Sequence, residues 1–187
     1  MTGIALNFNV FDYLLLSMMV ICILTDLKSR KIYNVVLIPF LLVGLAANTF
    51  SDHWQGLSES VKGLFLGLVL LFIPFAKGGI GGGDVKLLAV IGSIKGPLFV
   101  LMAFLYGAIA GGIFALALLI WHRRLLTTLT NGLMTAANLL IKRGIVLPVF
   151  LQANLEPTPE TLHLPYSLPI GAGVMVTYYT MLQNLAG

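Results

Sequence analysis

Two aspartates are the residues whose type and surroundings best suit chemistry in this sequence. Asp26 follows an apolar run, in the stretch T-D-L-K-S-R-K-I-Y-N, and Asp84 opens another, in G-G-I-G-G-G-D-V-K-L-L. Each is followed two residues later by a lysine, Lys28 or Lys86. Because residues i and i+2 of a helix do not face each other, we expect neither lysine to neutralise its own aspartate. Both acids are therefore free to meet.

Two carboxyl groups at hydrogen-bonding distance in a poorly solvated site cannot both ionise easily, so they share a proton and titrate as a pair. Aspartic peptidases use such a pair. One carboxylate is the general base for a water that attacks the scissile carbonyl. The other is protonated; it hydrogen-bonds the carbonyl oxygen and later protonates the leaving nitrogen. We expect this arrangement for Asp26 and Asp84.

Two other interpretations of these acids stay open. Asp26 could be a loop acid at the end of a helix, with Asp84 as a helix N-cap. Alternatively, the pair could carry protons or cations through a small transporter or channel. A transporter of this size is expected to show inverted repeats and acids near the bilayer midplane, whereas these acids lie at the ends of apolar runs.

The glycine run before Asp84 offers backbone that another chain can approach closely. It holds five glycines in six residues: Gly78, Gly79, Gly81, Gly82 and Gly83. A phosphate loop would carry Lys-Ser or Lys-Thr after the last glycine, where this sequence has an acid. The three histidines are far apart and Cys22 is the lone cysteine. We therefore expect no phosphate site, metal site, cofactor or disulfide.

Composition indicates a membrane protein. The 187 residues include only 11 Lys or Arg and 7 Asp or Glu, and 58% are hydrophobic. Soluble domains carry about 25% charged residues. The low charge excludes a soluble globular domain and disorder. Nucleic-acid binding is not expected despite the basic balance, because the basic residues sit in small clusters between apolar runs.

The apolar runs predict an all-α bundle of six transmembrane helices, since crossing the ~30 Å hydrocarbon core takes about 20 apolar residues. The fourth run is too short to cross alone, and we expect a half-length helix that breaks at Gly96-Pro97. Asp26 and Asp84 lie at the ends of predicted spans, where ionisable side chains are costly and mark functional sites. The six predicted spans are Val10–Thr25, Ile32–Phe50, Gly63–Ala76, Val85–Ile94, Pro97–Trp121 and Pro165–Leu185.

The basic residues predict the orientation. With both termini outside, nine of the 11 fall inside, and only Lys62 and Lys95 fall outside. The nine are Lys28, Arg30, Lys31, Lys77, Lys86, Arg123, Arg124, Lys142 and Arg143. Asp26 and Asp84 then lie at the inner boundary of the membrane, whereas Asp12 lies outside.

The remaining segments complete one predicted domain over residues 1–187. Residues 122–164 are expected to form a cytoplasmic, partly amphipathic connection against anionic headgroups. Gly107, Gly111 and Gly112 predict close helix packing, which could also serve a homodimer.

At its two aspartates the sequence resembles the type IV prepilin peptidases, a family of G-x-G-D intramembrane aspartic peptidases. Gly81-Gly82-Gly83-Asp84 matches G-x-G-D, and Asp26 to Asn34 resembles the family pattern D-x-[KR]-x-x-x-I-P-N. Pro165-Tyr166 matches a P-Y motif that opens the last helix.

The resemblance implies that Asp26 and Asp84 are the catalytic pair, at a site facing the cytoplasm from the inner membrane. It implies cleavage of the short basic leader of a prepilin or pseudopilin. The motif residues that support the site or bind substrate would be Lys28, Asn34, Gly81, Gly83, Lys86, Pro165 and Tyr166. A non-catalytic scaffold for pilus assembly stays open as a third function.

Three departures from the family pattern qualify the resemblance. Tyr33 stands where the family usually has proline, and Ser167 where glycine or alanine is common. Many bacterial members also methylate the new N-terminus and carry paired Cys-x-x-Cys zinc motifs, which this sequence lacks. It resembles the small peptidase-only form found with Tad/Flp pili, with archaeal preflagellin peptidases as the nearest alternative subgroup.

Overall fold

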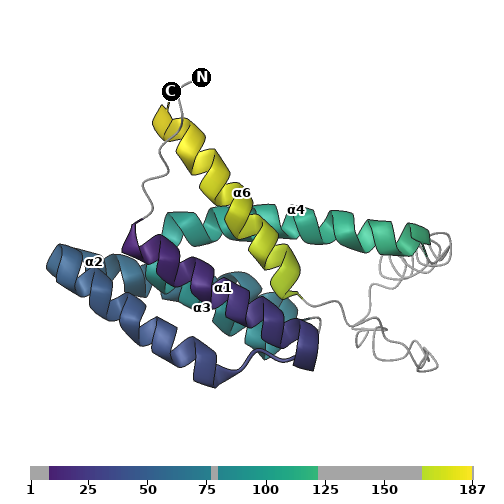
Figure 1. Ribbon diagram of the computed structural model, residues 1–187, viewed down its shortest axis with the longest axis horizontal. Coiled ribbons are helices and arrows are strands. Elements are labelled where there is room, and N and C mark those ends of the chain that lie inside the picture. Colours follow the sequence, from purple (N-terminus) through teal and green to yellow (C-terminus); the bar gives the residue numbers. More distant parts are fainter. Residues whose placement is uncertain (1–8, 77–79, 122–165, 187) are drawn as a thin grey trace, which may run out of the picture. The chain divides into compact units, whose positions relative to one another are not determined.

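The computed structural model describes residues 9–76, 80–121 and 166–186, and all regular structure in these ranges is α-helical. The helices are α1 (Val10–Ser29), α2 (Asn34–Ala76), α3 (Gly82–Lys95), α4 (Pro97–Trp121) and α6 (Ser167–Ala186) (Figure 1). The chain divides into two compact units, Met1–Gly111 with Pro165–Gly187, and Gly112–Leu164. The predicted connection over 122–164 lies outside the described residues. The site belongs to the first unit.

Three helical stretches of the described chain are long and apolar enough to cross a membrane: Val10–Ser29, Asn34–Ala76 and Pro97–Ala117. The all-helical membrane class is therefore confirmed. The first helix runs past its predicted end at Thr25, so Asp26 lies within it.

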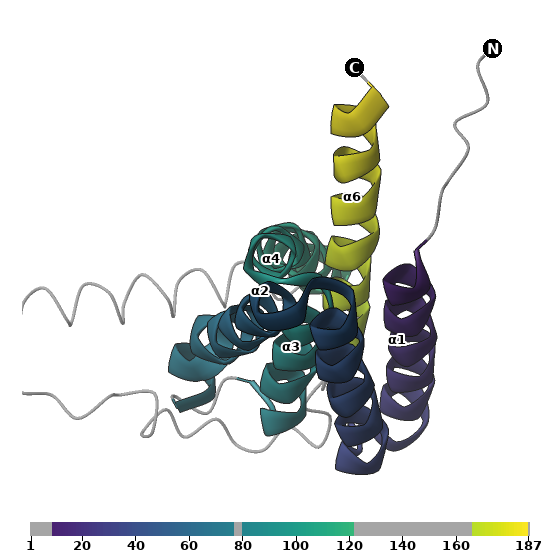
Figure 2. The same ribbon diagram turned by 90° about the vertical axis from the view of Figure 1, so that its left-hand side faces the viewer.

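The second and third predicted spans both lie in α2, which consists of two helices that meet at a kink with non-helical backbone angles at Asp52 and His53. His53 has a positive φ of 51°, which reverses the chain direction. Asn34 in the first half lies at the start of α3, and Gly44 lies near Ile94 at its end. The second half runs the other way, because Gly63 meets Gly92 and Gly67 meets Leu88. α2 is thus a helical hairpin around α3 (Figure 2).

The short fourth helix and its break are confirmed. α3 has only 14 residues, and Gly96 ends it with φ 84° and ψ 176°, directly before Pro97 begins α4. Apart from Lys86, every residue from Asp84 to Ile94 is buried. A helix that is apolar nearly all round is stable only when neighbours surround it.

Small residues let the second half of α2 approach α3 closely. A Cβ on Gly63 would overlap the backbone carbonyl of Gly92, and a Cβ on Gly92 would overlap that of Gly63. These glycines therefore allow two helix backbones to touch, as small residues do in membrane bundles.

We expect Gly63→Ala to destabilise the fold by about 1–3 kcal/mol, because neither backbone can move away without disturbing the hairpin. Alanine favours a helix by about 1 kcal/mol over glycine, so a loss would reveal the clash. The matched control is Gly112→Ala, where a Cβ would meet no atom of the described chain within 4 Å. Thermal unfolding in detergent measures both; equal melting temperatures would contradict the prediction.

The glycines of α4 contact α6 within the same chain. A Cβ on Gly107 would lie 3.1 Å from the Pro169 carbonyl oxygen, and one on Gly111 would lie 3.3 Å from the Pro169 side chain. The close packing predicted for these two glycines is therefore observed, within the chain.

At the end away from Asp26, α1, α3 and α6 are joined by a buried polar cluster. The Asp12 carboxylate forms an ion pair with the Lys95 ammonium and accepts a hydrogen bond of 2.7 Å from the Tyr178 hydroxyl. It also accepts one of 2.7 Å from the backbone N–H of Asn9. The Lys95 ammonium lies 5.3 Å from the Tyr178 ring centroid and 5.8 Å from that of Phe99. The sequence indicated Asp12 and Lys95 at the same end but not their contact.

Candidate active site

Asp26 lies in the last turn of α1 with its side chain turned into the helix bundle. Only 7% of the surface of Asp26 is exposed. Its backbone carbonyl accepts a hydrogen bond of 2.7 Å from Arg30, which ends the helix in a left-handed conformation. The open alternative of a loop acid is thus wrong, since Asp26 is a buried helical residue.

Asp84 lies in the first turn of α3 and is 9% exposed. Gly81 occupies the N-cap position, and the Asp84 N–H donates to the Gly81 carbonyl at 3.2 Å. The N-cap alternative for Asp84 is therefore also wrong. Burial and the negative charge of Asp26 both disfavour the charged form of the Asp84 carboxyl group, so the two acids are electrostatically coupled.

The structure adds Ser167 to this site. It is the first residue of α6 and fully buried. Its hydroxyl donates a hydrogen bond of 2.6 Å to Asp26 Oδ2, and its backbone N–H lies 3.3 Å from the same oxygen. The only sequence signal was that serine departs from the family pattern here.

Gly81 and Gly83, predicted to support the site, lie against it. A Cβ on Gly81 would come within 3.3 Å of Asp84 Oδ2, and one on Gly83 would come within 3.0 Å of the Ile32 Cβ. Gly81 therefore leaves the carboxylate accessible from one side. Gly83 lets the segment after α1 lie against the start of α3. Gly78 and Gly79 lie outside the described residues.

Lys28 and Lys86 are exposed, and neither forms an ion pair with the aspartate two residues before it within the described ranges. Instead, the Lys86 ammonium donates a hydrogen bond of 3.1 Å to Asn34 Oδ1, which joins α3 to the start of α2. Two of the predicted supporting residues therefore bind each other.

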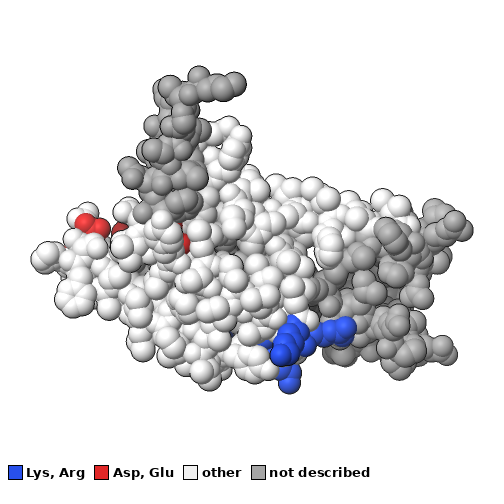
Figure 3. Space-filling view, in the orientation of Figure 1, with Lys and Arg blue, Asp and Glu red and all other residues white. Residues whose placement is uncertain are grey.

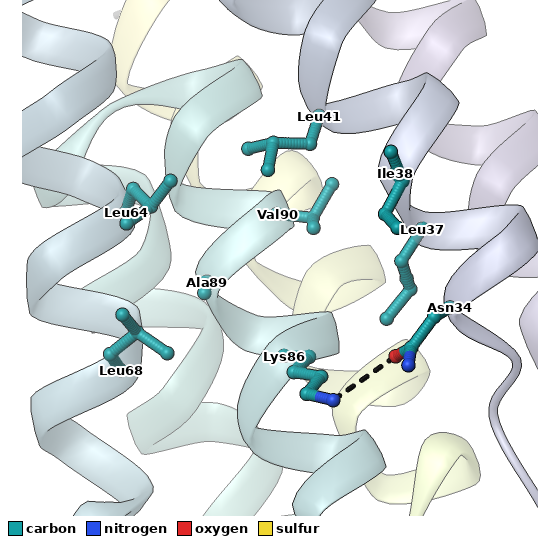
Figure 4. Close-up of a pocket in the computed structure, with 9 residues that line it drawn as sticks. All are labelled: Asn34, Leu37, Ile38, Leu41, Leu64, Leu68, Lys86, Ala89 and Val90. Carbon is teal, nitrogen blue, oxygen red and sulfur yellow. Dashed lines mark hydrogen bonds between the residues drawn. The ribbon is translucent and has the colours of Figure 1, made fainter.

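The Asn34–Lys86 contact lies at the edge of a pocket of about 290 Å³ between α3 and both halves of α2 (Figure 4). Its other lining residues are apolar: Leu37, Ile38, Leu41, Leu64, Leu68, Ala89 and Val90. The pocket thus presents an apolar wall with a polar end.

The remaining predicted residues divide between described and undescribed parts. Tyr166 directly precedes Ser167 and is 40% exposed. Pro165 lies outside the described residues. Basic side chains gather beside the end of α1 on the face shown in Figure 3, where Lys28, Arg30 and Lys31 are exposed. The two buried acids thus lie at the basic end of α1.

A model of the type IV leader peptidase family matches residues 13–116, which include both aspartates and all of α3. This chain belongs to that family. The matched range ends before α6, so Ser167 lies outside it.

Two curated relatives are about one third identical to the chain over the residues that align. A prepilin leader peptidase/N-methyltransferase of Bacillus subtilis is 35% identical over 112 residues, which cover 58% of this chain and 44% of the relative. One of Pseudomonas aeruginosa is 34% identical over 99 residues, 47% of this chain and 34% of the relative. The chain therefore spans less than half of either relative. No solved structure gives a significant match.

Proposed function

We propose that the chain is a membrane aspartic endopeptidase that removes the short basic leader from type IV prepilins or pseudopilins. The observation that carries the proposal is the pair of buried, electrostatically coupled carboxyl groups of Asp26 and Asp84. They come from two different helices of a chain that belongs to the type IV leader peptidase family. Carboxyl groups in such an environment suit acid–base catalysis.

The proposed reaction is hydrolysis of one peptide bond. One carboxylate takes a proton from water as the water oxygen bonds to the scissile carbonyl carbon. The protonated carboxyl group hydrogen-bonds the developing oxyanion and then gives its proton to the leaving nitrogen. As the C–N bond breaks, the carbonyl re-forms as a carboxylic acid. The proton taken from water passes to the second carboxylate and restores the starting state.

We further place the site at the cytoplasmic face of the inner membrane, within six spans that leave both termini outside. The exposed Lys28, Arg30 and Lys31 at the end of α1 support this orientation by the positive-inside rule. A basic leader would be drawn to carboxylates at this depth. α2 would supply two crossings, because its kink reverses the chain.

We propose that the chain lacks the N-methyltransferase activity for which its two curated relatives are also named. This sequence has one cysteine, Cys22, which is buried in α1, and only four residues separate α1 from α2. It therefore offers no paired cysteine motifs between these helices, where the bifunctional members have their insertion. Tad/Flp prepilins or archaeal preflagellins are the substrates to test first.

Leader removal from a co-expressed prepilin tests the function. Membranes that contain the wild-type chain should convert the prepilin to a shorter mature form, identified by its new N-terminal residue in mass spectrometry. A chain with both Asp26→Asn and Asp84→Asn should leave the leader attached. Unprocessed prepilin with the folded wild-type chain, across several prepilin classes, would favour the transporter or the scaffold instead.

A further inference from the structure

The two site carboxyl groups have different hydrogen-bond environments. Asp26 Oδ2 accepts the Ser167 hydroxyl and lies 3.3 Å from the Ser167 backbone N–H. That N–H is at the start of α6, where helix N–H groups lack helical acceptors and the helix dipole favours negative charge. These two donors hold the Asp26 carboxyl group in one orientation.

Asp84 lacks a comparable set of donors within the described chain. Its carboxylate has the Gly81 backbone as hydrogen-bond partner, and burial and the charge of Asp26 disfavour its ionised form. In the part of the chain that the structure describes, Asp84 from α3 and Cys22 from α1 lie close enough to feel the charge of Asp26. Neither is a cation. Asp84 is therefore the carboxyl group whose protonated form its surroundings favour.

We infer that Ser167 is a positioning residue that orients the Asp26 carboxyl group through two donors, so that Asp26 is the base that activates water and Asp84 is the acid. The inference rests on the proposed peptidase function and adds the assignment of the two roles. It also gives a purpose to the serine at which the chain departs from its family pattern.

The pH dependence of cleavage tests this assignment. Ser167→Ala removes the hydroxyl that donates to the proposed base, so we expect the acid limb of the kcat profile to move to higher pH. A hydrogen bond to a charged group is worth enough to shift it by about one pH unit. Below that limb the variant should cleave roughly tenfold more slowly at equal pH. Ser167→Thr keeps the hydroxyl and should restore the wild-type limb.

Thr177→Ala is the matched control, because Thr177 is also a fully buried hydroxyl residue of α6. Its hydroxyl donates to the Gly173 carbonyl at 2.8 Å, away from the carboxylates. It should leave the acid limb in place even if it lowers the melting temperature. Ser167→Cys, with a much weaker donor of similar size, replaces the alanine variant if that variant does not fold.

The outcomes separate the two proposals. An unchanged acid limb in folded Ser167→Ala or Ser167→Cys, with normal cleavage by the wild type, would refute the role of Ser167 and leave the peptidase function standing. A limb that moves equally in Thr177→Ala would refute it too, because the shift would then follow general destabilisation. No cleavage by the wild type would refute the function itself.

Discussion

Asp26→Asn and Asp84→Asn should each reduce the rate of prepilin cleavage by about 10³-fold or more. Asparagine keeps the shape of the side chain but can neither accept nor deliver the proton that the reaction moves, and acid–base groups contribute about 10²–10⁴-fold. Because the two groups act as one unit, the double variant should lose little more than either single variant. Leader release from a purified prepilin measures the rates.

The matched control for this experiment is Glu59→Gln, which removes a carboxylate without touching the site. Glu59 lies on the exposed face of α2 and pairs with Lys62 at 2.9 Å. Such a pair contributes little. Cleavage by Glu59→Gln should match the wild type. If folded Asp26→Asn or Asp84→Asn cleaved at the wild-type rate, the two-aspartate mechanism would be wrong.

The largest expected loss of stability comes from Lys95→Ala at the opposite end of the bundle. This variant leaves the Asp12 carboxylate, on a residue only 7% exposed, without its cation. Removing one partner of a buried ion pair costs about 3–5 kcal/mol. We therefore expect a clearly lower melting temperature in detergent, with loss of helical signal at temperatures where the wild type is intact.

Two further variants show whether the stranded charge is the cause. Lys62→Ala breaks an exposed ion pair, with side chains 61% and 52% exposed, and should change the melting temperature little. Combining Lys95→Met with Asp12→Asn removes both charges and should recover part of the loss. Equal melting temperatures for Lys95→Ala and Lys62→Ala would contradict the prediction.

The features that could be predicted from the sequence depend on local backbone rules. A proline disfavours helical backbone in the residue before it, and Gly96 adopts a positive φ that other residues avoid. The break between α3 and α4 could therefore be predicted from the Gly96-Pro97 pair. The two aspartates were found because acids are rare among apolar residues and their surroundings match a family motif.

The contacts that were missed depend on helix rotation and long-range packing. Ser167 and Asp26 are 141 positions apart, and no local pattern tells which face α6 turns toward α1. The sequence placed Asp12 at the outer end of the first helix, but it did not predict the ion pair with Lys95. The spacing of Asp12 after Asn9, which is that of a capping box, was a local signal that Asp12 has a structural role. A second signal for this ion pair was Lys95 itself, which is the last residue of the short helix α3.

The turn between the two halves of α2 was predicted, but the residues at which it occurs were not. Asp52 and His53 have no glycine or proline beside them, so nothing local marks the place where the chain reverses. The sequence predicted two separate spans on either side of this point, and α2 consists of two helices that meet there.

The burial of α3 implies an order of assembly. Fourteen residues are too few to hold a place in the bilayer alone, and nearly every side chain of α3 needs a neighbour from another helix. α3 can therefore settle only after the α2 hairpin exists to receive it. Since α3 carries Asp84 and α1 carries Asp26, a partly inserted chain lacks the pair of acids. The proposed peptidase would thus become active in the membrane only when folding of the chain is complete.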